Sequence, residues 1–321
     1  MSNPIRITII GLGRIGTSIG LALKQTQMKL HIVGHDKEPA HTRAALKRKA
    51  IDKGDWNLPR SVEGADLVIL ALPFNAIAET MRYIAEDLRP NAVVMDTSPL
   101  KQPVLAWAQE HLPDHVHFVG GHPIVRDVQR GIDHARPDLF RREIFAICPP
   151  PNTPAKAVKL ATDFVTALGA IPLFLDPGEH DSMMAAVEHL PQALALILAQ
   201  TVIAAPSWRE MRKLAGGQME ATTYVSSDSP EALADVLLHN REHVLTWLDM
   251  LTATAQEWRT LINEGAREEL IARVEDILEA RTDWLIAAQT GTWEEPPKTR
   301  GFSFVDWLFG QSLARRMRQG T

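Results

Sequence analysis

The hydrophobic residues in the first half of the chain form short runs that are rich in β-branched side chains. These runs are IRITII (5–10), LHIVGHD (30–36), ADLVILALP (65–73), NAVVMDTS (91–98), VHFVGG (116–121), EIFAICPP (143–150) and AIPLFLD (170–176). Segments with helical periodicity, such as IGTSIGLALKQ, lie between most of them. Strands that alternate with helices are typical of a mainly parallel, doubly wound sheet. We therefore expect an α/β fold over residues 1–177.

The pattern changes at the pair Pro177–Gly178, and such a pair commonly marks a boundary between elements. From about Asp181 to about Ala288 the hydrophobic positions keep a helical period, and no convincing strand pattern occurs. We expect an all-helical domain over residues 178–290, followed by a C-terminal tail over residues 291–321.

The first helical segment of this second domain, HDSMMAAVEHLPQALALILAQTVIAA, is apolar on nearly all sides after His189. A helix that is hydrophobic all round is normally buried. Because a domain this small would leave the helix partly bare, we expect a second copy of the chain to cover it. The pattern thus predicts a homodimer that forms through the helical domain.

Composition narrows the class of protein. A net charge of −5 over 321 residues gives no basic footprint for nucleic acid. There is no run of 18 apolar residues and no charged-then-apolar leader, so we expect a cytoplasmic protein without a membrane partner. The single cysteine, Cys148, excludes an internal disulfide and a multi-cysteine metal site. It is expected to be a core residue at a strand end, and we predict no metal site.

The sequence GLGRIG follows the first strand and opens a helix, and its residues are Gly11, Gly13, Arg14, Ile15 and Gly16. Glycines in this context allow a tight turn and let a pyrophosphate approach the free N–H groups of the helix N-terminus. Asp36 ends the second strand, where a carboxylate can bind both adenosine ribose hydroxyls and repel a 2′-phosphate. We therefore predict a nicotinamide dehydrogenase that favours NAD over NADP.

Two further residues belong to the expected nucleotide cleft. Leu72 and Pro73 end the run at 65–73, and ligands of such sheets bind at the carboxyl ends of strands. Lys37 and Arg43 could soften the preference for NAD. The alternative for the glycines is a simple strand–helix turn without a ligand.

The stretch FVGGHPIVRD (118–127) combines two glycines, a histidine and a proline. Glycine gives the backbone freedom and proline restricts it, so we expect a stiff turn after the strand at 116–121, with His122 at its mouth. A histidine that only caps a turn is the structural alternative.

Four ordered motifs resemble the prephenate and arogenate dehydrogenases of tyrosine biosynthesis. They are FVGGHPI, DLFRREIFAICPP, GEHDSMMAAVEHLPQALA and SSDSPEALADVLLHNREHVL, and the similarity extends from the first strand to about residue 262. It implies a Rossmann domain followed by a helical dimerisation domain. The implied reaction oxidises a cyclohexadienol, which loses carbon dioxide and becomes aromatic.

The resemblance also implies roles for individual residues. His122 would be the catalytic base or hydrogen-bond acceptor for the substrate hydroxyl, because a neutral imidazole can accept its proton. His189 would contact the substrate from the helical domain, although a lone histidine on an apolar helix is more often a core residue. His180 and Asp181 match the family's His-Asp pair, and Asp181 could equally cap the helix that begins there. Asn240 and the neighbouring Arg241 could serve a subunit contact.

The chain departs from the family pattern at two places. In DTSPLK, Asp96 and Lys101 match, but Pro99 stands where the family usually has a serine, so Ser98 or Thr97 would supply the hydroxyl. We therefore expect Ser98 and Lys101 to be catalytic together with His122.

The second departure concerns the family's substrate-binding arginine, where this chain has Tyr224 at or near the position. A phenol does not replace a guanidinium fork on a carboxylate without loss. Arg209, Arg212, Lys213 or Arg126 could compensate. Tyr224, Arg126 and His189 are thus the candidate residues for a small carboxylate substrate.

Three functions remain open at this point. The first is NAD-dependent oxidation of prephenate to 4-hydroxyphenylpyruvate, with arogenate as the other plausible substrate. The second is a paralogous dehydrogenase that acts on another small hydroxy acid. The third is a dinucleotide-binding dimer that no longer catalyses, which the presence of His122, Lys101 and His189 disfavours.

Overall fold

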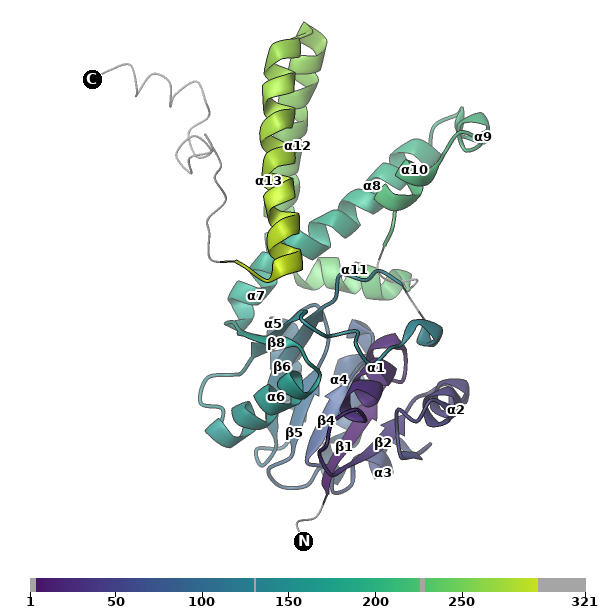
Figure 1. Ribbon diagram of the computed structural model, residues 1–321, viewed down its shortest axis with the longest axis vertical. Helices are drawn as coiled ribbons and strands as arrows, with labels where there is room; N and C mark the ends of the chain where they lie inside the picture. Colours follow the sequence, from purple (N-terminus) through teal and green to yellow (C-terminus); the bar gives the residue numbers. More distant parts are fainter. Residues whose placement is uncertain (1–3, 130, 226–228, 294–321) are drawn as a thin grey trace, which may run out of the picture. The chain divides into compact units, whose positions relative to one another are not determined.

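The structure is a computed structural model that describes residues 4–129, 131–225 and 229–293. It contains two compact units, residues 1–248 and 249–321. The first unit holds the sheet, the helices that cover it and the helices that follow it (Figure 1). The C-terminal tail expected over 291–321 lies outside the described residues from 294 onward.

Eight strands form one sheet in the first unit. They are β1 (Ile5–Ile10), β2 (Leu30–His35), β3 (Lys53–Gly54), β4 (Leu67–Leu70), β5 (Val93–Asp96), β6 (His117–Ile124), β7 (Ile144–Cys148) and β8 (Ile171–Phe174). Their order is β3-β2-β1-β4-β5-β6-β7-β8, and all neighbours are parallel except β6 and β7. The doubly wound α/β fold is therefore confirmed. The short strand β3 was not predicted.

Helices on both faces bury the apolar strands. The helices of the sheet region are α1 (Arg14–Leu23), α2 (Pro39–Lys47), α3 (Leu58–Val62), α4 (Ile77–Ile84), α5 (Gln102–His111) and α6 (Ala155–Ala167), with short helices η1 (Phe74–Ala76), η2 (Ala85–Asp87) and η3 (Ile132–His134). The two core clusters lie on opposite faces of the sheet. One contains Ile9 and Ile69 and the other contains Ile10 and Leu70, since neighbouring strand residues point to opposite faces.

The rest of the described chain is helical, as predicted. It consists of α7 (Pro177–Met184), η4 (Ala185–His189), α8 (Leu190–Ile203), α9 (Trp208–Met211), α10 (Gly217–Thr222), α11 (Pro230–His239), α12 (Arg241–Glu264) and α13 (Arg267–Thr290). The helical region begins at Pro177, the first residue of α7, after Asp176 caps that helix. The domain boundary at residues 177/178 remains a prediction.

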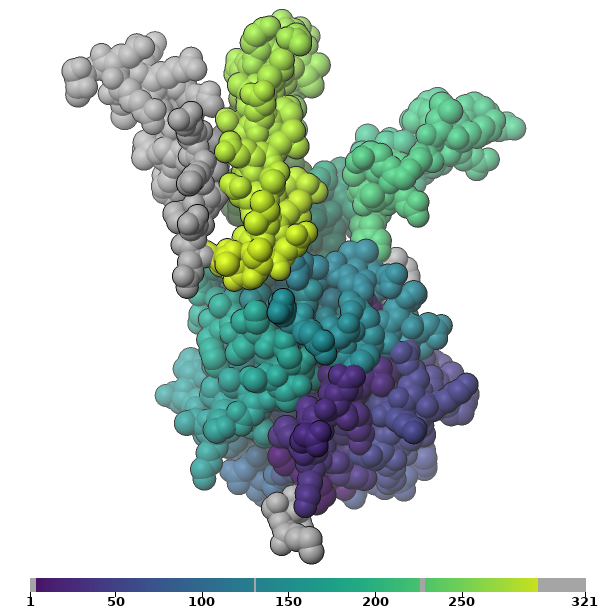
Figure 2. All heavy atoms as spheres, viewed as in Figure 1, coloured from purple at the N-terminus to yellow at the C-terminus, as the bar shows by residue number. Residues whose placement is uncertain are grey.

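The segment Pro177–Ile203 is one continuous helical rod, and it is long and apolar enough to cross a membrane by length and composition. A single helix of this kind does not by itself indicate a membrane span, because core helices of soluble proteins have the same length and composition. Large side chains of α8 such as Leu194, Ile197 and Ile203 are exposed in the single chain. This exposure agrees with the expectation that the helix is left partly bare, and covering by a second copy stays a prediction. In the space-filling view α8 to α10, in green, stand out from the body of the first unit (Figure 2).

The described part of the second unit contains the end of α12 and the whole of α13. Gly265, which has a φ of +65°, lies in the turn between the two helices. Arg273 on α13 forms an ion pair with Glu257 on α12 at 3.0 Å. Apolar side chains of α13 such as Ile277, Leu278 and Trp284 are exposed.

Candidate active site

The strand order reverses between β1 and β4, and sheets of this kind bind a nucleotide in the crevice at the carboxyl ends of these strands. Gly11 has a φ of +91°, and a Cβ there would lie 2.2 Å from the Ala71 carbonyl oxygen; a Cβ on Gly16 would lie 1.9 Å from the Gly11 carbonyl oxygen. Both positions therefore require glycine. Gly13 has open space around its missing Cβ and precedes α1 without a side-chain cap. The backbone here fits a pyrophosphate at the helix N-terminus.

Asp36 lies where a ribose-binding carboxylate is expected. Its Oδ2 accepts a hydrogen bond from the backbone N–H of Leu12 at 2.7 Å, and its Oδ1 accepts one from Glu38 at 2.8 Å. These contacts fix the carboxylate beside the glycine-rich loop. Leu72 and Pro73 follow β4 on the other side of the same crevice, where the Leu72 side chain lies against Gly11. The structure thus brings the predicted nucleotide-binding residues together.

Arg14 does not point freely into this crevice. Its guanidinium pairs with the Asp127 carboxylate at 2.8 Å and also donates to the Asp127 and Gln129 carbonyl oxygens. The hydroxyl of Tyr224 donates a hydrogen bond to the Val128 carbonyl oxygen in the same loop. Arg14 and Tyr224 therefore both hold the segment that follows His122.

His122 lies inside a strand, so the expected turn at Gly120–Pro123 is wrong. Strand β6 continues through His122, which pairs with Ala146 of the antiparallel strand β7. The reason is visible in Pro123. The Gly121 N–H points toward β5, where it donates to the Asp96 carboxylate. Backbone nitrogens two residues apart in a strand face the same side, so the nitrogen of Pro123 also points toward β5. At that position the pairing between β5 and β6 has already ended. The missing N–H of proline therefore costs no ladder hydrogen bond.

The two glycines before His122 provide space rather than a turn. A Cβ on Gly121 would lie 2.7 Å from the Asp96 carbonyl oxygen, and one on Gly120 would lie 3.0 Å from the side chain of Lys101. The Lys101 side chain, 1% exposed, donates to the Asp96 carboxylate and to the Gly121 carbonyl oxygen. This buried ion pair holds the strand segment that carries His122.

Ser98 is part of the same support. Its hydroxyl lies within hydrogen-bond distance of the Asp96 carboxylate and 2.9 Å from the Leu100 carbonyl oxygen, and its N–H also donates to Asp96. Both Ser98 and Lys101 were predicted to be catalytic. Their polar atoms are engaged with protein groups that shape the loop after β5, and a catalytic role for them stays a prediction.

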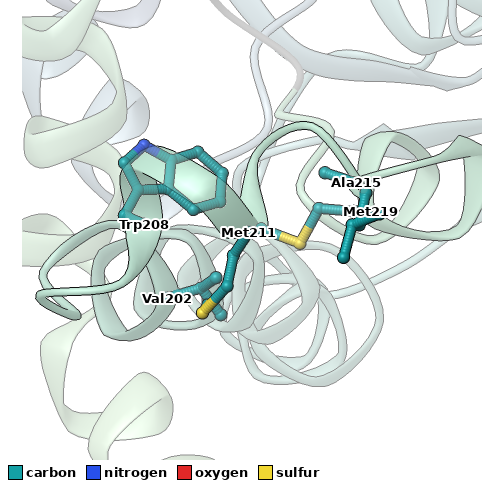
Figure 3. Close-up of a pocket in the computed structure, with 6 residues that line it drawn as sticks. Val202, Trp208, Met211, Ala215 and Met219 are labelled. Carbon is teal, nitrogen blue, oxygen red and sulfur yellow. The ribbon is translucent and has the colours of Figure 1, made fainter.

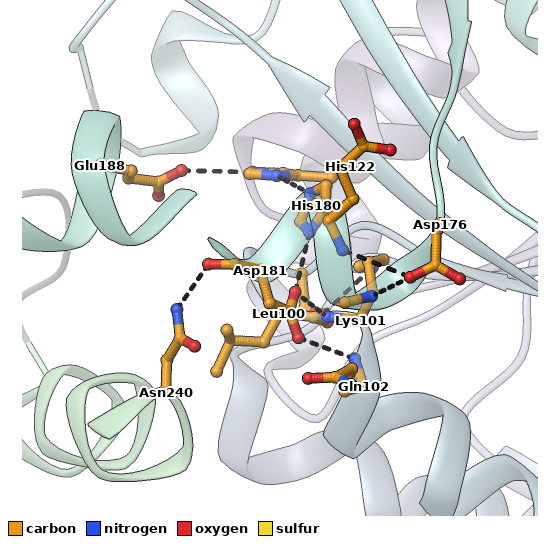
Figure 4. A network of polar contacts seen from close by, with 12 residues as sticks. Leu100, Lys101, Gln102, His122, Asp176, His180, Asp181, Glu188 and Asn240 are labelled. Atoms are coloured by element: carbon orange, nitrogen blue, oxygen red, sulfur yellow. Dashed lines mark hydrogen bonds and ion pairs between the residues drawn. The ribbon is translucent and has the colours of Figure 1, made fainter. Parts of the chain in front are cut away.

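Three buried side chains, His122, His180 and Asp181, form a chain of contacts (Figure 4). His122 Nδ1 lies 3.1 Å from His180 Nε2, and His180 Nδ1 lies 2.8 Å from Asp181 Oδ1. Burial, together with the nearby His180 and Lys101, lowers the pKa of His122 well below its usual range. His122 is therefore a neutral imidazole at neutral pH, the form that can accept a proton.

Asp181 does not cap its own helix, which corrects one of the two roles considered for it. Asp176 caps α7, accepting from the N–H groups of Gly178 and Glu179. The Asp181 carboxylate instead accepts from the backbone N–H groups of Lys101 at 2.7 Å and Gln102 at 2.8 Å, at the N-terminus of α5. It thereby joins the helical region to the loop of the buried ion pair.

The rod widens to a π-helical turn at η4, directly before Pro191 in α8. Proline lacks an N–H, and its ring crowds the carbonyl group one turn earlier, which disturbs a regular α-helix. Such π turns occur frequently at functional sites. Here the turn presents two adjacent residues, Glu188 and His189, to the region around His122.

Glu188 was not identified from the sequence. Its Oε2 lies 3.6 Å from His122 Nε2, and the Glu188 side chain is 30% exposed (Figure 4). Burial raises the pKa of this carboxyl group to about 7. The signal in the sequence was a charged residue within an otherwise apolar helix, next to a histidine.

His189 is buried, and its Nδ1 lies 3.0 Å from the Nδ2 atom of Asn240. The same amide donates to the Asp181 carbonyl oxygen at 2.8 Å. Burial lowers the pKa of His189 to about 4, against the smaller opposing effects of the Asp181 carboxylate and the Pro99 carbonyl. Nε2 of His189 makes no hydrogen bond of ordinary geometry with described protein atoms. The sequence suggested only a subunit contact for Asn240, and its hydrogen bond to His189 was not predicted.

The candidates for binding a substrate carboxylate are spread out. Arg126 is half-exposed and forms an ion pair with Glu143 at 2.9 Å. Arg209, Arg212 and Lys213 are exposed around α9. The structure of the single chain does not bring these cations to His122.

Neither a metal site nor a reactive cysteine occurs among the described residues. Among them no group of three His, Cys, Asp or Glu residues could hold a metal ion. Burial raises the pKa of Cys148 to about 12, which suits a core residue and not a nucleophile.

A pocket of about 210 Å³ lies away from His122 on the helical segment (Figure 3). Its lining is apolar and consists of Val202, Trp208, Met211, Leu214, Ala215 and Met219. It has no titratable side chain, so it cannot perform the chemistry expected of His122.

The comparisons with known proteins agree with this geometry. Residues 19–172 match the family model of the prephenate dehydrogenase nucleotide-binding domain, and residues 176–276 match that of the prephenate dehydrogenase dimerisation domain. The chain is 29% identical to prephenate dehydrogenase of Bacillus subtilis, over 84% of this chain and 73% of the relative. It is 28% identical to cyclohexadienyl dehydrogenase of Zymomonas mobilis, over 86% of this chain and 94% of the relative.

A solved structure gives the same result. Prephenate dehydrogenase from Aquifex aeolicus, in complex with hydroxyphenyl propionate and NAD+, superposes with a TM-score of 0.79 at 25% identity and covers 88% of this chain and 99% of that one. The two family models together span strands β2 to β7, the start of β8 and most of the helical region described above. The chain therefore belongs to the prephenate dehydrogenase family of oxidoreductases.

Proposed function

We propose that the protein catalyses the NAD-dependent oxidative decarboxylation of prephenate to 4-hydroxyphenylpyruvate. The observation that carries this proposal is the position of His122, a buried neutral imidazole held on β6. The nicotinamide cofactor, when bound, accepts a hydride. Gly11, Gly13, Gly16 and Asp36 would hold its nucleotide part.

His122 would accept the proton of the ring hydroxyl as the hydride leaves the carbon that bears it. General-base assistance of this kind contributes about 10²–10⁴-fold to a rate. The electrons of the carbon–carboxylate bond then enter the ring, carbon dioxide departs and the ring becomes aromatic. The phenolate oxygen formed in this step can take the proton back from His122, so the reaction releases no net proton.

We propose that His189 donates a hydrogen bond to the substrate. Asn240 has its amide hydrogens directed at the Asp181 carbonyl oxygen and at His189 Nδ1. The reverse orientation would set the Asn240 oxygen against the Asp181 carbonyl oxygen. Nδ1 of His189 is then an acceptor, and in the neutral ring Nε2 carries the hydrogen. A carboxylate or carbonyl oxygen of the substrate is the matching partner.

We further propose that the protein is a cytoplasmic homodimer without nucleic-acid or membrane partners. The exposed apolar side chains of α8, such as Leu194 and Ile197, and the groove around Trp208 support a covering subunit. So does the match of residues 176–276 to a dimerisation domain. Sedimentation without detergent tests this: a monodisperse dimer is expected, and a monomer or a detergent-dependent species would contradict it.

The decisive assay mixes the protein with NAD and prephenate and follows the reduced cofactor by absorbance. Arogenate, which carries an amino group in place of the keto group, forms the second arm, and NADP replaces NAD in a third. Turnover with prephenate and NAD is expected. Turnover with arogenate alone would change the substrate, and none with either would leave a paralogous dehydrogenase or a non-catalytic dimer.

A further inference from the structure

A neutral histidine can accept a proton at Nε2 only in one of its two tautomers. In that tautomer Nδ1 carries the hydrogen and Nε2 has the lone pair. Nε2 of His122 is the nitrogen that faces Glu188, away from His180. The proposed chemistry therefore depends on what holds the hydrogen on Nδ1.

The chain of contacts behind His122 begins at a carboxylate. Asp181 accepts hydrogen bonds from the backbone N–H groups of Lys101 and Gln102, and an ionised carboxylate can only accept. Its Oδ1 also lies 2.8 Å from His180 Nδ1. Nδ1 of His180 must therefore carry a hydrogen and donate it to Asp181.

The next link is the other nitrogen of His180. This side chain has no exposed surface, and the Asp181 carboxylate is its partner at Nδ1. When this ring is neutral with its hydrogen on Nδ1, Nε2 of His180 has a lone pair.

That lone pair lies 3.1 Å from His122 Nδ1. Two lone pairs would repel at this distance, so Nδ1 of His122 donates its hydrogen to His180. We propose that His180 and Asp181 are positioning residues that fix the tautomer of His122 and leave Nε2 as the proton acceptor. This inference rests on the proposed function for its purpose, and on the contacts alone for the tautomer.

The same arrangement suits the proton that His122 takes up. An imidazolium at His122 keeps its Nδ1–H bond to His180, and the Asp181 carboxylate at the end of the chain favours positive charge on either ring. Because the proton can return to the phenolate oxygen, the chain needs no outlet to solvent. A closed, buried arrangement is therefore sufficient.

The first test uses the unliganded wild-type protein with ¹⁵N-labelled histidine. The His122 signals are assigned by their loss in a His122→Asn variant. Nuclear magnetic resonance distinguishes a ring nitrogen that carries hydrogen from one that does not. We expect a protonated Nδ1 and an unprotonated Nε2 at His122 at neutral pH, and the opposite tautomer would overturn the proposal.

The second test compares two substitutions of His180. His180→Phe keeps a ring but removes the acceptor, so the His122 tautomers should mix and kcat should fall about 10- to 100-fold, the range typical of partners that orient a functional histidine. KM should change little, because His180 lies on the Nδ1 side of His122, away from Nε2. His180→Gln restores an acceptor near the former Nε2 and should recover part of kcat and the Nδ1–H tautomer.

His115→Phe is the matched control. His115 precedes β6, at the opposite end of the strand from His122, and its Nε2 makes only a 3.3 Å contact with the Leu88 carbonyl oxygen. It should leave kcat and the His122 tautomer unchanged. An unchanged kcat in His180→Phe would overturn the proposal. If His180→Phe does not fold, the wild-type spectrum and His180→Gln still decide. If prephenate and arogenate both fail as substrates, the spectrum still tests the tautomer by itself.

Discussion

Asn240 and His189 are joined by a hydrogen bond of 3.0 Å between two buried side chains that lie 51 positions apart in the chain. The asparagine, at the end of α11, thus sets which nitrogen of the histidine faces the substrate region. A residue without direct access to substrate can in this way control how tightly substrate is bound.

Asn240→Ala should therefore raise KM for the substrate more than it lowers kcat, because His189 is then free to turn or to change its tautomer. It also leaves the Asp181 carbonyl oxygen without its donor. We expect the free energy of unfolding to fall by about 1–3 kcal/mol. Initial-rate kinetics and urea unfolding measure both effects, and an unchanged KM would argue against His189 as a substrate contact.

His122→Asn should lower kcat by about 10²–10⁴-fold, since asparagine cannot accept the hydroxyl proton as a base. The affinity for NAD should remain nearly unchanged, because His122 does not form the nucleotide crevice. Stopped-flow or steady-state rates give the first value and fluorescence titration with the cofactor gives the second. A variant with normal turnover would make His122 a structural residue.

Asp36→Ala should weaken discrimination against NADP. The substitution removes the negative charge that repels a 2′-phosphate, together with the acceptor that holds the Leu12 N–H. The ratio of kcat/KM for NAD to that for NADP measures the effect. If the ratio stays the same, the preference must reside in other residues near the end of β2.

Lys101→Met should destabilise the protein by about 3–5 kcal/mol, because it leaves the Asp96 carboxylate buried without its counter-ion. The double variant Lys101→Met, Asp96→Asn should recover a clear part of this loss, since the amide needs no cation. Urea unfolding of the two single variants and the double variant forms the thermodynamic cycle. Additive losses would show that the two side chains do not interact.

Glu188→Gln should stabilise the protein more at pH 8 than at pH 5. Burial raises the pKa of Glu188 to about 7 from an ordinary value of 4.5, so the folded state binds the proton more tightly than the unfolded state does. Stability that depends on this group is therefore present at low pH and lost as the pH rises through about 7. Because the side chain is partly exposed, we expect a change of about 1 kcal/mol.

Thermal or urea unfolding of Glu188→Gln and wild type at both pH values measures this difference. Glu179→Gln is a suitable control, because Glu179 lies in the first turn of the same helical rod. A stability difference for Glu188→Gln that does not vary with pH would show that the carboxyl group is already ionised in the folded protein.

The sequence predicted the elements well and the contacts around His122 poorly. Strand runs such as IRITII and the glycine pattern after it are local signals, because burial on both faces of a parallel sheet leaves a continuous apolar run. The turn expected at Gly120–Pro123 was wrong because its strand partner, β7, lies beyond a long loop and cannot be read from the stretch itself.

The polar network was out of reach for the same reason. Asp181 accepts a hydrogen bond from Lys101, at the N-terminus of α5, which lies 80 positions away in the chain. Asn240 donates to the Asp181 carbonyl oxygen from 59 positions away. The sequence offered single residues with two possible roles each, and only the packing of α7 and α11 decides between them. The resemblance to a family supplied the order of the motifs, and it did not supply Glu188.

The π turn at Ala185–His189 has a consequence for how this rod can vary. A π turn holds one residue more than the α-helical turn it replaces. Removing one residue there would return the rod to a regular helix, and because the π turn holds its extra residue within one turn, α7 and α8 would keep their relative orientation. Deleting Glu188 would thus remove the carboxylate that approaches His122 and leave the exposed apolar stripe of α8 on the same side of the rod, so subunit pairing would survive.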